Sequence, residues 1–175
     1  MLASFVGRKI RTYPAITGES CFIEMAHLDR AESLGRGIVR ALGLRGPFKM
    51  DFKQDERDGR LVLLEVNARY NLWHYLGAAN GINLPEVAYR WLVEGSEPQR
   101  VDYDTRVRWL DLGLDYKTCR ERRAAGATSL PAWLFSIVRA RKVHAVFHWS
   151  DPGPMLKYWL SLGRRRLSRW LFSAS

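Results

Sequence analysis

The sequence contains only two cysteines, Cys21 and Cys119, among 175 residues. That number is too small for the disulfide framework of a small secreted domain, so both are expected to be reduced thiols of a cytosolic protein. No stretch approaches the ~18 uninterrupted apolar residues of a membrane span. The apolar run within residues 1–9 is too short for the core of a signal peptide, and no cleavage pattern follows it. These absences predict a soluble, cytoplasmic protein.

The sequence also lacks internal repeats. Its 14 glycines and 7 prolines follow no period, which excludes a collagen-like or low-complexity chain. Hydrophobic residues make up 47% of the chain and charged residues 26%, a balance that excludes wholesale disorder. The length allows one domain of typical size, or one and a half small ones. It is short for an enzyme that must bind a nucleotide and two further substrates.

Acidic residues are in deficit, with 18 Asp and Glu against 28 Lys and Arg, and the deficit is uneven. Residues 1–100 hold 14 basic and 12 acidic side chains, a net charge of +2, whereas residues 101–175 hold 14 and 6, a net charge of +8. The composition changes near residues 94–99, which predicts one region over 1–95 and a basic extension over 96–175. A nucleic-acid partner is not expected, because no recognition module accompanies the basic residues.

Hydrophobic periodicity and turn residues predict an α+β fold. A helix is expected over 29–42, capped by Asp29 and ended by Gly43. Further helices are predicted over 72–79, 84–93, 116–125, 132–140 and 155–172, and strands over 21–25, 48–53, 61–66, 107–112 and 143–149.

The two strands over 48–53 and 61–66 are predicted to form a hairpin, because an Asp58-Gly59 turn lies between them. Glu65 and Asn67 are two residues apart, so both side chains leave the same face of the sheet. If the connecting loop has three or five residues, Asp51 lies directly opposite Glu65. Two carboxylates facing each other repel, and a divalent cation between them makes the arrangement favourable.

Magnesium suits this set, because it prefers hard oxygen ligands and leaves its remaining positions to water and phosphate. The predicted ligands are Asp51, Glu65 and the amide oxygen of Asn67. Arg69, two residues further on, would extend a guanidinium group toward the same phosphates or a developing oxyanion. The alternative is that these are exposed polar residues of an amphipathic hairpin.

At these residues the chain resembles the ATP-grasp superfamily, close to its carboxylate–amine ligase and D-aspartate ligase-like branches. The matching segments are Gly46–Lys53, the Asp58-Gly59 turn, Leu64–Arg69 and Ala79–Pro85, with Lys9–Pro14 and Gly18 upstream. The resemblance covers about residues 1–95. It implies the carboxyl-terminal half of an ATP-grasp fold, an antiparallel sheet with flanking helices, followed by a mainly helical basic subdomain.

The resemblance implies ATP and Mg²⁺ as cofactors, with two magnesium ions bridging the ATP phosphates. The implied metal ligands are Asp51, Glu65 and Asn67. Arg69 is the implied catalytic residue and also a phosphate contact, and Lys9 is a further nucleotide contact. Arg11 is a second catalytic candidate, for phosphate or a substrate carboxylate, with a solvated basic residue on a strand as its alternative.

The implied enzyme is an ATP-dependent C–N ligase that transfers the γ-phosphoryl group to a carboxylate. An amine then displaces phosphate from the acyl phosphate. This reaction requires the protein mainly to position the substrates and to neutralise charge. The resemblance also implies a preceding half with phosphate-binding lysines and an adenine-contacting acid. The chain begins after most of that half, so a separate partner chain, a fragment or a lost activity is expected.

A second hypothesis is a non-catalytic module that binds a partner or an anionic membrane surface through a basic carboxyl-terminal helix. On a helix over 155–172 the apolar side chains fall on one side and most basic ones on the other. The apolar set is Leu156, Trp159, Leu160, Leu167, Trp170 and Leu171, and the basic set is Lys157, Arg165 and Arg169. The alternative is a helix packed on the body of the protein.

Overall fold

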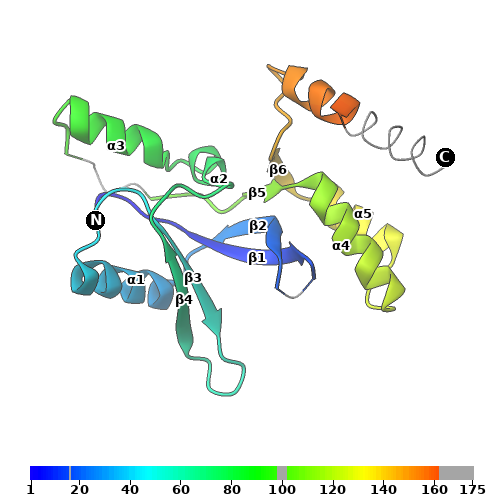
Figure 1. The fold of residues 1–175 in the computed structure, drawn as a ribbon, viewed down its shortest axis with the longest axis horizontal. Coiled ribbons are helices and arrows are strands. Elements are labelled where there is room, and N and C mark those ends of the chain that lie inside the picture. Colours follow the sequence, from blue (N-terminus) through cyan, green and yellow to red (C-terminus); the bar gives the residue numbers. More distant parts are fainter. Residues whose placement is uncertain (16, 98–101, 162–175) are drawn as a thin grey trace, which may run out of the picture.

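The computed structural model describes residues 1–15, 17–97 and 102–161. The fold is mixed α+β, as the sequence predicts, with a four-stranded sheet, a separate two-stranded hairpin and flanking helices (Figure 1). The strands are β1 Val6–Tyr13, β2 Glu19–Ala26, β3 Lys49–Gln54, β4 Leu61–Asn67, β5 Val107–Leu110 and β6 Arg141–His144. The helices are α1 Asp29–Leu42, α2 Tyr75–Ala79, α3 Leu84–Val93, α4 Leu112–Ala124 and α5 Leu130–Val138.

The four-stranded sheet has the order β1-β2-β5-β6. Neighbours β1 and β2 are antiparallel, as are β2 and β5, whereas β5 and β6 are parallel. A parallel pair needs a crossover connection, and here α4 and α5 supply it. These two helices therefore cover one face of the sheet.

The sheet has an apolar core on each face. Ile23 pairs with Trp109, and both belong to a buried cluster with Trp73, Leu76 and Tyr103 on the face near α2. The next pair along, Phe22 and Leu110, points the other way and packs with Cys119, Trp133 and Ile137 from α4 and α5. Adjacent residues of β2 thus contribute to opposite faces.

The boundary expected between residues 95 and 96 falls between α3 and β5. The strand β5 hydrogen-bonds to β2, and Trp109 of β5 packs in the same cluster as Ile23. The two sequence regions therefore share one sheet and one core, and the basic region contributes strands as well as helices.

The observed elements agree with most of the predicted ones. The helix α1 has the predicted bounds, and Gly43 ends it in the left-handed conformation with φ 60°. Asp29 was expected as the cap and this was wrong: Leu28 precedes the helix, and Asp29 lies in its first turn, where an acid favours the helix dipole. The strand expected over 143–149 is also shorter, because β6 ends at His144.

Residues 153–161 are helical at the start of the expected helix over 155–172, and positions 162–175 lie outside the described residues. Among the described residues, no helix is both long enough and apolar enough to cross a membrane.

Candidate functional site

The hairpin β3–β4 places Asp51 directly opposite Glu65, as the sequence predicts. The connection has six residues, 55–60, between the paired Gln54 and Leu61, instead of the expected three or five. A regular hairpin with this connection would put Leu64 opposite Asp51. The register shifts by one residue between the Phe52–Leu63 and Asp51–Glu65 pairs, so Leu64 is bulged and Glu65 takes the facing position.

The hairpin has one polar and one apolar face. Lys49 pairs with Asn67 and Asp51 with Glu65, and paired residues of an antiparallel ladder share a face. Met50, on the opposite face, lies against α1 near Gly35. The candidate ligands therefore lie on the side of the hairpin away from α1.

Two lysines neutralise the two carboxylates of this face. The Nζ atom of Lys49 lies 2.6 Å from Oδ2 of Asp51 and 4.0 Å from Oε1 of Glu65. The Nζ atom of Lys9, from β1, lies 3.3 Å from Oδ1 of Asp51. Asn67 donates from Nδ2 to Oε1 of Glu65 at 2.8 Å, which holds the two polar side chains of β4 together.

The Asp51 carboxylate is held in its ionised form. Burial by itself would raise its pKa, but hydrogen bonding and the charges of Lys49 and Lys9 outweigh burial and lower the pKa below the ordinary value of 3.8. Because the folded-state pKa is the lower one, the stability that Asp51 contributes is present above that ordinary value. It is lost as the pH falls through the folded-state pKa.

Arg69 lies just beyond this cluster. Its side chain is exposed and donates from a terminal nitrogen to the Tyr70 carbonyl at 3.3 Å. Its backbone N–H donates to the Asn67 carbonyl at 2.9 Å, which turns the chain away from β4. The guanidinium group is therefore close in sequence to the ligand set and open to an incoming group.

The structure separates Arg11 from the hairpin. Lys9 pairs with Ile23 and Arg11 with Phe22, so Ile10 is bulged. Because Ile23 and Phe22 point to opposite faces of the sheet, the bulge sends Lys9 and Arg11 to opposite faces as well. Lys9 reaches Asp51, whereas the Arg11 guanidinium stacks 4.4 Å from the Phe22 ring.

Arg11 instead forms a buried ion pair with Asp115 of α4. Its Nε and terminal nitrogen donate to the two carboxylate oxygens of Asp115 at 2.6 and 2.9 Å. The Arg11 side chain is 10% exposed and that of Asp115 is fully buried. Asp115 also accepts from Nε1 of Trp133 at 2.7 Å and from the Cys21 thiol at 3.4 Å. Arg11 is thus not a solvated strand residue, and its charge is already neutralised.

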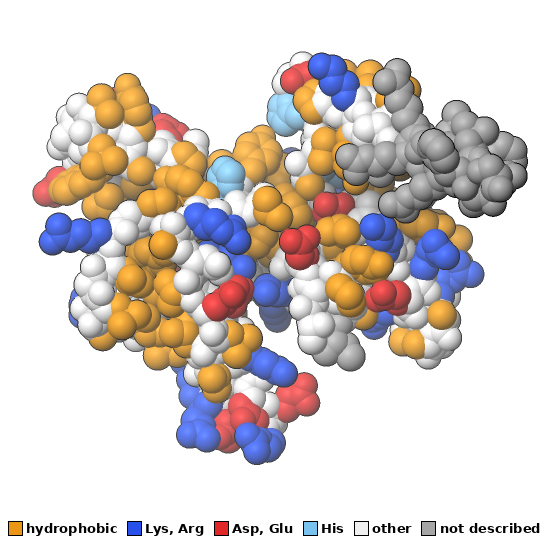
Figure 2. Space-filling model, in the orientation of Figure 1, with side chains coloured by type: hydrophobic (Ala, Val, Ile, Leu, Met, Phe, Trp, Pro, Cys, Tyr) orange, Lys and Arg blue, Asp and Glu red, His pale blue; other side chains and the backbone are white. Residues whose placement is uncertain are grey.

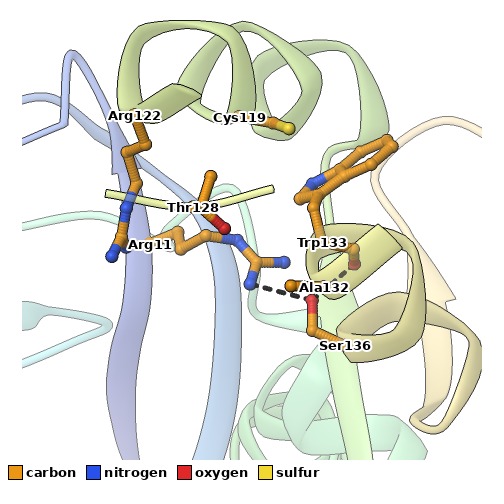
Figure 3. Close-up of a pocket in the computed structure, with 7 residues that line it drawn as sticks. All are labelled: Arg11, Cys119, Arg122, Thr128, Ala132, Trp133 and Ser136. Atoms are coloured by element: carbon orange, nitrogen blue, oxygen red, sulfur yellow. Dashed lines mark hydrogen bonds between the residues drawn. The ribbon is translucent and has the colours of Figure 1, made fainter. Parts of the chain in front are cut away.

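A pocket of about 160 Å³ adjoins this ion pair (Figure 3). Figure 3 shows the Arg11 guanidinium reaching the Ser136 hydroxyl, with which it forms a 3.1 Å hydrogen bond. The lining residues are Arg11, Cys119, Arg122, Thr128, Ala132, Trp133 and Ser136. Since Arg11 is engaged with Asp115, we assign this cluster to the packing of β1 against α4 and α5.

We expect the Cys21 thiol to resist alkylation in the folded protein. Burial raises its pKa to about 12, so almost no thiolate forms at neutral pH, and the side chain is inaccessible. Iodoacetamide should therefore add to neither buried cysteine of the native chain and to both in urea, with a native rate at least about a hundredfold slower. Intact-mass measurement checks this, and a native adduct mapped to Cys21 would contradict it.

Sequence reasoning missed Lys49 and Asp115. Lys49 has a signal, because it is two residues before Asp51 on an alternating strand and so shares its face. Asp115 has none, since its partner Arg11 is 104 residues away in the sequence.

The hairpin face fits a hard divalent cation. Two carboxylates and an amide share it, and the Lys49 ammonium group shows that a positive charge is accommodated beside both acids. The described part of the chain holds no cluster of three or more His, Cys, Asp or Glu side chains suited to a metal, so any further ligands must be the amide, phosphate or water. In comparisons with protein-family models, with curated proteins and with solved structures, no match to this chain was found.

Proposed function

We propose that the polar face of the β3–β4 hairpin binds a magnesium–ATP complex, and that the chain is the metal-binding part of an ATP-grasp ligase. The observation that carries the proposal is the facing pair Asp51 and Glu65 with a cation beside both. Its substrates would be a small-molecule carboxylate and an amine. The phosphate-binding lysines of the other half would come from a separate chain or a further part of the protein.

The residues of this face have separable roles in the proposal. Asp51 and Glu65 offer anionic oxygens, and Asn67 offers an amide oxygen once Nδ2 is engaged with Glu65. Lys49 and Lys9 balance the two carboxylates, so these four side chains carry no net charge and can accept a nucleotide together with its metal. Arg69 is the cation placed to contact phosphate oxygens.

Bound magnesium would neutralise the charge on the phosphate oxygens as the γ-phosphoryl group is transferred. The remaining contribution is positioning: two short strands hold the acids at fixed separation, and Lys9 comes from the rigid sheet. A carboxylate substrate activated as an acyl phosphate needs no nucleophilic side chain from the protein. The hairpin face offers none, in agreement with this chemistry.

The substitution Glu65→Gln tests the proposal. It keeps the size of the side chain and its hydrogen bond to Asn67 but removes one anionic ligand, so we expect affinity for Mn²⁺ or Mg²⁺ with ATP to fall about tenfold. Binding is measured by Mn²⁺ electron paramagnetic resonance and by calorimetry with ATP, without reliance on turnover.

Glu86→Gln is the matched control. Glu86 is a similarly exposed glutamate on α3, paired with Arg90, and lies outside the hairpin. Its replacement should leave metal and ATP affinity unchanged. If wild type binds Mn²⁺–ATP and Glu65→Gln binds it equally well, the site assignment is wrong.

A further inference from the structure

Helix α5 is apolar on all sides but only partly covered. Its nine residues contain one polar side chain, Ser136. Trp133 and Ile137 are buried against the sheet, whereas Leu134, Phe135 and Val138 are 47%, 63% and 76% exposed. On a helix these three lie together on the side away from the buried pair. An apolar stripe of this kind normally marks a surface that contacts something other than water.

Positive charge surrounds this stripe. The Arg139 guanidinium carbon lies 5.8 Å from the Phe135 ring centroid, and Arg141 is exposed at the start of β6. Between positions 120 and 141 the chain has five arginines and one acid, Glu121, a net charge of +4. Within the described residues, neither Arg139 nor Arg141 forms an ion pair with an acidic side chain.

The exposed apolar side chains at the end of α3 lack this setting. Leu92 and Val93 at the end of α3 are 78% and 65% exposed. Glu86 and Arg90 of this helix form an ion pair with each other, and an acid, Glu94, directly follows Val93. Figure 2 shows Lys and Arg side chains, with some acidic ones, among hydrophobic side chains over the α4–α5 region. Apolar exposure and unpaired positive charge thus coincide at α5.

We propose that the outer face of α5, defined by Leu134, Phe135 and Val138 with Arg139 and Arg141, docks on an anionic lipid surface. A short helix too small to cross a membrane lies in the interface with its apolar side among the acyl chains. The flanking arginines then meet the lipid headgroups, and each contributes through the negative surface potential. The Phe135 ring lies beneath Arg139, an arrangement that suits the boundary between acyl chains and headgroups because one group is apolar and the other charged.

This inference does not rest on the proposed ligase activity, because α5 covers the face of the sheet opposite to the one that Lys9 uses. It also concerns described residues only, unlike the amphipathic segment over 155–172. A catalytically inert chain would dock in the same way.

Vesicle co-sedimentation of the full chain tests the proposal. The chain should pellet with phosphatidylcholine vesicles that contain phosphatidylserine and much less with pure phosphatidylcholine. Raising the ionic strength from about 0.1 M to about 1 M shortens the Debye length from about 10 Å to about 3 Å, so binding should weaken. The double variant Phe135→Asp/Val138→Asp should lose at least about tenfold in partitioning, since two buried apolar side chains are replaced by anions.

The control is Leu92→Asp/Val93→Asp, in which two side chains of nearly equal exposure on α3 receive the same charges. This variant should bind vesicles like wild type apart from the small effect of net charge. Circular dichroism confirms that both variants are folded. The variant Arg139→Ser/Arg141→Ser is an independent test of the basic side chains. It keeps the apolar stripe and should reduce binding only to anionic vesicles.

Three outcomes would overturn the proposal. The first is no sedimentation of wild type with anionic vesicles. The second is equal loss in the α3 and α5 variants, which would show a general charge effect. The third is concentration-dependent self-association in analytical ultracentrifugation that the Phe135→Asp/Val138→Asp variant abolishes, which would make the stripe an interface between two copies of the chain.

Discussion

Asp115→Asn should destabilise the protein by about 3–5 kcal/mol, because it leaves the Arg11 guanidinium buried without a counter-charge. The carboxylate accepts from Arg11, Trp133 and Cys21, and an amide can satisfy only part of this set. For a chain of this length the expected fall in melting temperature is on the order of 10 °C. Urea denaturation followed by Trp fluorescence measures the change.

Asp58→Asn is the matched control. Asp58 and Arg60 make an Nε–carboxylate contact of the same 2.6 Å length, but their side chains are 39% and 72% exposed. Its loss should cost less than about 1 kcal/mol, as for other surface ion pairs. The double variant Arg11→Met/Asp115→Leu should be more stable than Asp115→Asn, since no buried charge is left unpaired. A cost below 1 kcal/mol for Asp115→Asn would show that the pair is not buried as described.

Lys49→Met should change the affinities for metal and for nucleotide in opposite directions. The ammonium group beside Asp51 and Glu65 competes with a divalent cation, so its removal should raise the affinity for Mn²⁺ alone by about tenfold. In the proposed site it also neutralises Asp51 and Glu65, which would otherwise repel the phosphates, so affinity for ATP should fall by about tenfold. Calorimetric titrations with metal alone and with nucleotide separate the two effects.

Lys53→Met is the control for this experiment. Lys53 lies on the same strand and the same face, four residues further along, but its side chain is exposed and its strand partner is Val62. Neither affinity should change by more than about twofold, because exposed charges are screened by salt. Equal effects at both positions would mean that only the overall charge of the hairpin matters.

The hairpin was predictable because its signals are local. Alternation from Phe48 to Phe52 and the Asp58-Gly59 turn indicate two paired strands, and β3 and β4 confirm them. The prediction that Asp51 faces Glu65 was also right, but the cause is a bulge and not an odd number of residues in the connection. The bulge at Leu64 offsets a connection one residue longer than the upper expected length. Two consecutive leucines in an alternating strand are compatible with either face, so alternation cannot locate the extra residue.

Long-range pairing was beyond sequence reasoning. Lys9 and Arg11 are two residues apart and would share a face on a regular strand, and the resemblance implied roles in ligand binding for both. The bulge at Ile10 turns Lys9 and Arg11 to opposite faces of the sheet. The acid that pairs with Arg11, Asp115, lies on α4 and is distant in the sequence. The strand β5 was predicted over 107–112, but its pairing with β2 was not, because that partner is set by tertiary packing.

The bulge at Ile10 lets two cations that are two residues apart serve separate acids on opposite sides of the sheet. If β1 instead paired regularly through Ile10, Lys9 and Arg11 would share a face, and either Asp51 would lose its contact with Lys9 or Asp115 its pair with Arg11. Deleting Ile10 would make the lysine and the arginine direct neighbours, which keeps them on opposite faces but removes the packing of Ile10. Replacing Ile10 by another apolar residue would preserve both pairings and its packing against the Phe22 cluster. Related chains that keep both contacts should therefore carry either a bulged residue between the lysine and the arginine or the two cations as direct neighbours in the strand.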